Sequence, residues 1–249
     1  MTFAVILVVT AAATLALRNP IKKWPMLFYA LAVIVDVLFV VGSFVALPRT
    51  LWSGLFLLVQ KCTLSLALFV VVMYIGVFAR DSKVKRWLRP IRAELSIIAW
   101  ILSLGHMAVY LVSYLPRMAA GGPMHDNVTV AFVLAIVLFV LLLVLGATSF
   151  NMVKKRMKTE SWKRLQRLSY VFFALVYAHL LLMLLPSALH GAAAPQANVA
   201  VYSVVFVGYF VLRLVRFALD RRAEGAEVAS AGSDGDGEGA EAELTPRAL

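Results

Sequence analysis

The sequence predicts an all-α, polytopic integral membrane protein, and three observations support this prediction. Of its 249 residues, 62% are hydrophobic and 15% are charged, whereas soluble domains are about half apolar and about a quarter charged. The apolar residues fall into blocks long enough to cross a bilayer as helices, which takes about 20 residues. Basic residues gather in alternate links between these blocks, as they do in multi-pass proteins.

We expect about seven transmembrane helices, because seven apolar blocks are separated by short polar links. The first block has no basic residues before it and several after it. We therefore expect it to be retained as a span and not cleaved as a signal peptide. The seven blocks cover residues 2–17, 26–47, 53–78, 94–115, 128–149, 169–188 and 197–219.

The basic charge of the links predicts the orientation. One set of alternate links holds sixteen lysines and arginines, and the other set holds two. The positive-inside rule puts the sixteen in the cytoplasm, which places the N-terminus outside and the C-terminus inside a bacterial inner membrane. The basic links are 18–24, 80–92 and 151–167, and the others are 48–52, 116–127 and 190–196.

Composition divides the chain into a membrane bundle, residues 1–222, and an acidic tail, residues 223–249. The tail holds seven acidic residues, one basic residue and no aromatic residue, which predicts disorder. The bundle has a net charge of +17, but this charge sits in the links and indicates topology, so we expect no nucleic-acid partner. The single cysteine, Cys62, excludes an internal disulfide, a CxxC redox pair and a cysteine-based zinc cage. We expect it to be a small buried residue.

Two histidines stand in otherwise apolar runs, His106 in LSLGHMAVY and His179 in ALVYAHLLL. Each lies twelve residues from the basic end of its block, about 18 Å along a helix, and the two helices run in the same direction. The imidazoles are therefore expected at one level near mid-membrane, where ionisable residues are rare and usually functional.

Two level, neutral imidazoles fit the axial ligation of a heme iron. A zinc or copper site would need a further ligand that these helices do not offer. Gly105, beside His106, would let a flat ring approach the helix backbone. The alternative for each histidine is a plain hydrogen bond to a neighbouring helix.

Two stretches, RPIRAELSIIAWILSLGHMAVYLVSYL and SWKRLQRLSYVFFALVYAHLLLMLLP, resemble the ferric-reductase-like transmembrane domain family over roughly residues 50–190. Within it they are most similar to the heme-binding membrane subunits of bacterial methionine sulfoxide reductase systems, the MsrQ type. The family has an arginine fourteen residues before the first heme histidine, matched by Arg92. Its W-x-x-L-H-R-L-x-Y element is matched by Trp162, Leu165, Arg167, Leu168 and Tyr170.

The resemblance implies a six-helix core plus one helix, with a heme b held by His106 and His179. It also implies one heme per chain, because Gln166 stands where the family has a further heme-ligating histidine. The stretch after residue 222 has no glycine-rich phosphate loop of the kind that binds FAD or NAD(P)H. We therefore expect the reductant to be a membrane quinol or a separate flavoprotein, with a quinone or FMN as a further candidate cofactor.

Other polar residues are candidates for roles beside the heme. Asp36 and Lys61 are expected at one level of neighbouring antiparallel spans, as a structural ion pair or a proton relay, or with Lys61 on a heme propionate. Arg92 is the candidate for a propionate or a quinone. His190, eleven residues after His179, is a reserve candidate for a second ligand or an electron-exit contact.

The sequence thus predicts an iron-binding membrane cytochrome b that serves as the electron-transfer subunit of an oxidoreductase system. It would move electrons from a quinol or a cytoplasmic flavoprotein to an extracytoplasmic acceptor protein. The candidate site residues are His106, His179, Arg92 and Lys61. The alternative is a heme-free membrane transport or binding protein that uses the two histidines with Asp36 and Lys61 as a proton or ligand site.

Overall fold

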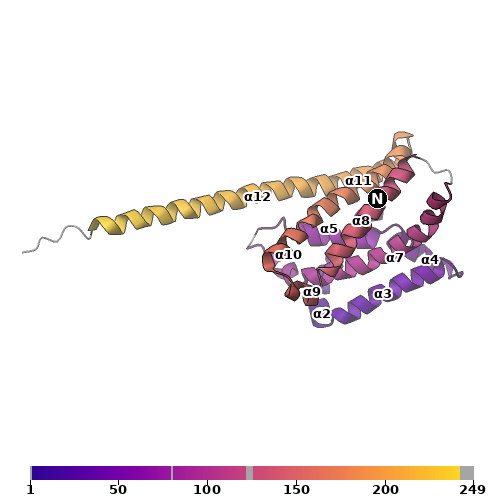
Figure 1. Ribbon diagram of the computed structural model, residues 1–249, viewed down its shortest axis with the longest axis horizontal. Helices are drawn as coiled ribbons and strands as arrows, with labels where there is room; N and C mark the ends of the chain where they lie inside the picture. Colours follow the sequence, from indigo (N-terminus) through magenta and orange to yellow (C-terminus); the bar gives the residue numbers. More distant parts are fainter. Residues whose placement is uncertain (1, 80, 122–125, 242–249) are drawn as a thin grey trace, which may run out of the picture.

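The computed structural model describes residues 2–79, 81–121 and 126–241, and these residues form helices joined by short turns (Figure 1). Two elements depart from the α-helix: η1 is a π-helix and η2 is a 3₁₀-helix. The elements up to η2 are α1 (Thr2–Ala16), α2 (Arg18–Lys23), α3 (Pro25–Gly42), α4 (Arg49–Leu55), η1 (Phe56–Gln60), α5 (Thr63–Tyr74), α6 (Lys83–Leu88) and η2 (Arg89–Ile91). The rest are α7 (Arg92–Ala119), α8 (Asp126–Ala147), α9 (Asn151–Arg156), α10 (Thr159–Gln166), α11 (Leu168–Leu189) and α12 (Ala193–Glu241).

The predicted polytopic helical architecture is confirmed. In the described part of the chain, five helical stretches are each long and apolar enough to cross a membrane, and a bent pair brings the number to six. The apolar block at 2–17 forms α1, a helix of 15 residues, which is shorter than a bilayer needs. The five stretches are Pro25–Gly42, Lys83–Ala119, Asp126–Ala147, Thr159–Leu189 and Ala193–Ala223, and the bent pair is Arg49–Gln60 with Thr63–Tyr74.

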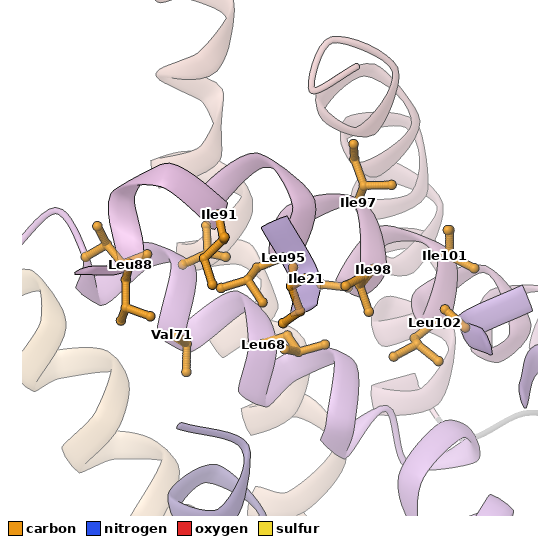
Figure 2. Close-up of a cluster of buried hydrophobic side chains, with 14 residues drawn as sticks. Ile21, Leu68, Val71, Leu88, Ile91, Leu95, Ile97, Ile98, Ile101 and Leu102 are labelled. Carbon is orange, nitrogen blue, oxygen red and sulfur yellow. The ribbon is translucent and has the colours of Figure 1, made fainter. Parts of the chain in front are cut away.

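Helix α7 lies at the centre of the bundle, against α3 on one side and α5 on another. Its apolar residues recur every three or four positions, which gives the helix a continuous buried stripe. Figure 2 shows Leu95, Ile98 and Leu102 of this stripe in one buried cluster with Leu68 and Val71 of α5. The helix that carries His106 is therefore held from several sides.

Helix α11, which carries His179, packs against α8 and α12. Aromatic rings fill its contact with α12: the ring centroids of Phe173 and Phe206 are 4.4 Å apart, and those of Phe173 and Tyr209 are 4.9 Å apart. All three side chains are almost fully buried. This packing fixes α11 beside the centre of the bundle.

A serine pair joins α5 and α7. The buried Ser65 hydroxyl donates to the carbonyl of Ala99 at 2.7 Å and also contacts the Ser103 hydroxyl. Small residues let two membrane helices approach closely, and their hydroxyl groups can form hydrogen bonds across the contact.

Beyond the bundle, α12 continues as one helix to Glu241 and extends away from the other helices (Figure 1). Residues 242–249 lie outside the described residues. The division at residue 222 and the disorder of 223–249 stay predictions, which rest on the lack of bulky apolar residues in that stretch.

Gly146 of α8 lets the side chain of Trp100 on α7 lie directly against the helix backbone. A Cβ at this position would overlap the indole ring. The ring is also held from another side by Phe150, in an edge-on contact with centroids 5.7 Å apart. The α7–α8 contact therefore depends on the absence of a side chain at Gly146.

We expect Gly146→Ala to lower the free energy of unfolding by about 1–3 kcal/mol, because the indole of Trp100 must move out of a packed position. The matched control is Gly54→Ala, where a Cβ would meet nothing within 4 Å. The control should be neutral or slightly stabilising, by at most about 1 kcal/mol, since alanine is the better helix former. Thermal unfolding in detergent, followed by circular dichroism, measures both. Equal stability of the two variants would show that the contact is not tight.

Candidate functional site

A cavity of about 410 Å³ lies inside the bundle, and both predicted histidines line it. Its walls come from α1, the η1–α5 region, α7, α8, α11 and α12, and most of them are apolar. The volume falls within the range of about 300–1,000 Å³ typical of cofactor and ligand sites. The polar residues in its walls, besides the histidines, are Thr2, Gln60, Lys61, Cys62, Thr63, Ser103, Tyr110, Tyr114, Asn198 and Tyr202.

The third predicted span is broken where it passes this cavity. After the π-helical turn η1, the chain leaves the helix at Lys61 and Cys62 and re-enters it at Thr63, with a bend of 41°. Cys62 has φ 53°, a left-handed conformation that disfavours side chains with a Cβ. The Thr63 hydroxyl donates back across the break to the Leu57 carbonyl at 2.6 Å.

The break supplies the hydrogen-bond acceptor for His106. A carbonyl at the end of a helical segment lacks the N–H group that would follow it in an unbroken helix. The Gln60 carbonyl, the last of η1, lies 2.6 Å from Nδ1 of His106. Nδ1 of His179 lies 3.1 Å from the carbonyl of Ala131 on α8. Each histidine is thus hydrogen-bonded to a backbone oxygen of a different helix.

These two contacts set the tautomer of both rings. A carbonyl oxygen can only accept a hydrogen bond, so Nδ1 must be the donor in each ring. In a neutral imidazole the lone pair is then on Nε2, the arrangement that metal-bound histidines usually have. The alternative predicted from the sequence, a hydrogen bond to a neighbouring helix, is therefore present for each histidine, and it does not occupy Nε2 of either ring.

The residues around the cavity fit a heme better than a bare metal ion. In the part of the chain that the structure describes, no group of three or more His, Cys, Asp or Glu side chains is placed to hold a metal ion. A protein-bound zinc or copper site normally needs three or four such ligands. An iron porphyrin needs at most two from the protein, and this cavity supplies two imidazoles.

An aromatic row extends from His106 along α7. The ring centroids of His106 and Tyr110 are 4.7 Å apart, and those of Tyr110 and Tyr114 are 5.9 Å apart. The guanidinium of Arg117 lies 5.7 Å from the ring of Tyr114. Tyr114 was missed by the sequence reasoning, although its position eight residues after His106 places it on the same helix face.

Asp36 does not form the ion pair with Lys61 that was one prediction from the sequence. Its Oδ2 accepts a hydrogen bond from the Gly105 amide at 3.1 Å, and its Oδ1 is buried with no partner. The ammonium of Lys61 instead lies 5.5 Å from the ring of Phe56, and the Lys61 side chain is exposed. The prediction failed because equal depth says nothing about which way each helix face points.

Gly105 serves a purpose different from the one predicted. A Cβ there would lie 2.5 Å from Oδ1 of Asp36, so the missing side chain makes room for a carboxylate. The group that approaches this glycine therefore comes from α3. Asp36 holds the α7 backbone immediately before His106 and acts as a positioning residue.

Two candidate residues, Arg92 and His190, lie away from the cavity, as does Gln166. Arg92 is the first residue of α7, about 21 Å along the helix from His106. His190 is exposed, and its Nδ1 lies 2.6 Å from the Pro186 carbonyl of its own helix. The side-chain amide of Gln166 donates to the Thr148 hydroxyl at 3.0 Å.

Comparison with known proteins agrees with this arrangement. Residues 59–177 match the family described as Ferric reductase like transmembrane component, a stretch that includes His106 and ends two residues before His179. The chain is also 34% identical over 227 residues to an uncharacterized protein of Treponema pallidum (strain Nichols). That alignment covers 87% of this chain and 60% of the relative, so the chain spans about 60% of the length of the curated protein it matches. No solved structure matches. A ferric-reductase-like transmembrane domain is therefore found here, and it suggests a role in transmembrane electron transfer.

The left-handed conformation of Cys62 leads to a testable order of stabilities. We expect Cys62→Gly to unfold within about 1 kcal/mol of the parent chain, because glycine adopts this conformation freely and this gain offsets the lost thiol contacts. Cys62→Val should unfold more easily by about 1–2 kcal/mol or more, since a branched side chain is strongly disfavoured at positive φ. Thermal unfolding of the three proteins in one detergent tests the order. A valine variant as stable as the glycine variant would argue against a strained break.

Proposed function

Starting from the ferric-reductase-like domain at residues 59–177, we propose that the protein is a membrane cytochrome b with one heme b between His106 and His179. One observation supports this most directly. Each Nδ1 is bound to a backbone carbonyl, which leaves two Nε2 lone pairs in the walls of one cavity. A heme bound there would accept and release electrons one at a time, and the protein would tune it through its ligands and surroundings.

The protein residues have separate tasks in this proposal. His106 and His179 bind the iron, and the carbonyls of Gln60 and Ala131 orient their rings. The apolar walls exclude water from the ligand nitrogens. Lys61, which is exposed and lines the cavity, would hold an anionic group such as a propionate.

We propose one heme and not two because the position of the family's additional histidine is occupied differently. The amide of Gln166 is committed to the Thr148 hydroxyl, and the nearby Trp162 indole donates to the Thr148 carbonyl at 3.0 Å. These contacts tie α10 to the end of α8 and offer no imidazole at that level.

The charge of the links predicts the orientation, and we propose that electrons flow from the cytoplasmic side to the outer side. With the basic links in the cytoplasm of a bacterial cell, a quinol or a cytoplasmic flavoprotein would supply electrons and an extracytoplasmic protein would accept them. A quinone or FMN is the further cofactor that such a donor implies. In MsrQ-type systems, which the sequence resembles, the acceptor is a reductase that repairs methionine sulfoxide, and we propose an acceptor of this class.

The test is the visible spectrum of the purified protein. We expect a reduced-minus-oxidised spectrum of low-spin heme b, at about one heme per chain by the pyridine hemochrome assay. His106→Ala and His179→Ala should each lose this spectrum, because each removes one of the two axial ligands. His190→Ala is the matched control and should keep a full complement, since its imidazole is bonded within its own helix.

Three results would contradict the proposal in whole or in part. No heme in protein from heme-replete cells would favour the heme-free transport or binding protein. Full heme content in both the His106 and His179 variants would place the cofactor elsewhere. Two hemes per chain would overturn the single-heme assignment while keeping the cytochrome. Size-exclusion chromatography of each variant shows whether a loss of heme reflects misfolding.

A further inference from the structure

Five cationic side chains from four elements converge at one end of the bundle, where α7 and α11 begin and α12 leaves the other helices. We call this the basic end. Arg92 lies within electrostatic range of Arg89 and Arg213, and Lys85 lies within range of Arg89, Arg213 and Arg216. This end contains residues that the proposed heme site does not use.

Arg213 of α12 is held in a fixed orientation without a carboxylate. Its Nε and Nη2 donate to the hydroxyl of Tyr170 at 3.2 and 3.0 Å, and its Nη1 donates to the Gly76 carbonyl at 3.3 Å. A guanidinium has five N–H donors, so two remain. The Tyr170 oxygen accepts twice, which leaves its own hydrogen available to an acceptor.

Arg216, one turn further along α12, also has an unused donor. Its Nη2 forms an ion pair with Asp220 at 2.6 Å, whereas its Nε is buried and has no hydrogen-bond partner. Among the described residues, the ammonium of Lys85 donates to a neutral group, the Phe78 carbonyl at 3.0 Å. Asp220 also lies within electrostatic range of Lys85, so one carboxylate is shared among five cations. Like charges this close, and partly shielded from water, are unfavourable unless further negative charge lies among them.

We propose that the basic end binds a phosphate group between Arg213, Arg216, Arg92 and the Tyr170 hydroxyl. Guanidinium forks and a hydroxyl donor are the groups that recognise the several acceptor oxygens of a phosphate. An acidic phospholipid headgroup and a soluble phosphate compound share this chemistry. The charges of flexible links would already satisfy the positive-inside rule, so topology does not account for guanidinium groups that are oriented by hydrogen bonds.

The proposal does not depend on heme binding, and it concerns the other end of α7. Besides Asp220, which is paired with Arg216, the nearest acidic residues that follow on α12 lie between residues 223 and 241. They continue along α12, which extends away from the bundle (Figure 1). An external phosphate is therefore favoured over the chain's own tail.

The experiment measures binding to purified, delipidated protein in a neutral detergent. Two probes are titrated, phosphatidylglycerol in mixed micelles and inorganic pyrophosphate, with phosphatidylcholine as the uncharged reference, and unfolding temperature is the readout. We expect Arg213→Gln and Arg216→Gln each to weaken binding about fivefold, as the loss of one basic contact does. Tyr170→Phe, which removes only a hydroxyl, should also weaken it.

The matched control is Arg221→Gln, the same change of charge on the same helix. Its guanidinium lies 4.9 Å from the ring of Phe217 and takes no part in the cluster, so binding should match the parent chain. A response to the lipid alone supports the site and identifies a headgroup as its occupant. A response to pyrophosphate supports a soluble phosphate compound.

Three outcomes overturn the proposal. Binding to neither probe shows that no phosphate site exists. Equal weakening in the Arg213, Arg216 and Arg221 variants shows a diffuse surface charge and not a built site. Binding that appears only when the chain is shortened at residue 222 shows that the acidic tail itself occupies the cluster. Circular dichroism of each variant confirms that the fold is kept.

Discussion

The hydrogen bond from His106 to the Gln60 carbonyl connects the break in the third span with the cavity. Inside a bilayer no water is available, so a backbone carbonyl released from a helix must find a donor within the protein. Here the donor is an imidazole of a neighbouring helix, at 2.6 Å. The break therefore persists because His106 satisfies it, and His106 keeps one tautomer because the break exists. The bend between η1 and α5 and the orientation of the first histidine are thus joined by this one contact.

Next to this contact, the bundle buries the carboxylate of Asp36 at a position where an apolar side chain would be expected. Asp36 is only 9% exposed, and its single hydrogen bond is to the backbone of α7. Burying a carboxylate with few hydrogen bonds costs free energy, and an apolar residue of similar size would avoid that cost. The hydrogen bond that Asp36 accepts from the α7 backbone partly offsets it. The Asp36 carboxylate accepts a hydrogen bond from the Gly105 amide, and Gly105 directly precedes His106. The carboxylate is therefore linked to the imidazole through one short stretch of backbone.

Much of this arrangement could be predicted from the sequence, and the failures have definite causes. Hydropathy located most of the spans because length and apolar character are what a bilayer demands. Equal distances from the basic ends predicted that His106 and His179 lie near each other, and both line one cavity. The break at Lys61 and Cys62 was missed because no glycine or proline marks it. The ion pair of Asp36 with Lys61 failed because depth was predicted and helix rotation was not. The contacts of Gln166 depend on tertiary packing and leave no local signal.

Both imidazoles take their orientation from a helix other than their own, and this has a consequence for biogenesis. Membrane helices insert first and associate afterwards. An inserted but unassembled chain offers His106 and His179 neither carbonyl, so each ring is free to rotate and to exchange tautomers. The two rings would be held for the heme that we propose only once η1, α7, α8 and α11 have come together. Insertion of that heme would therefore follow the assembly of these helices.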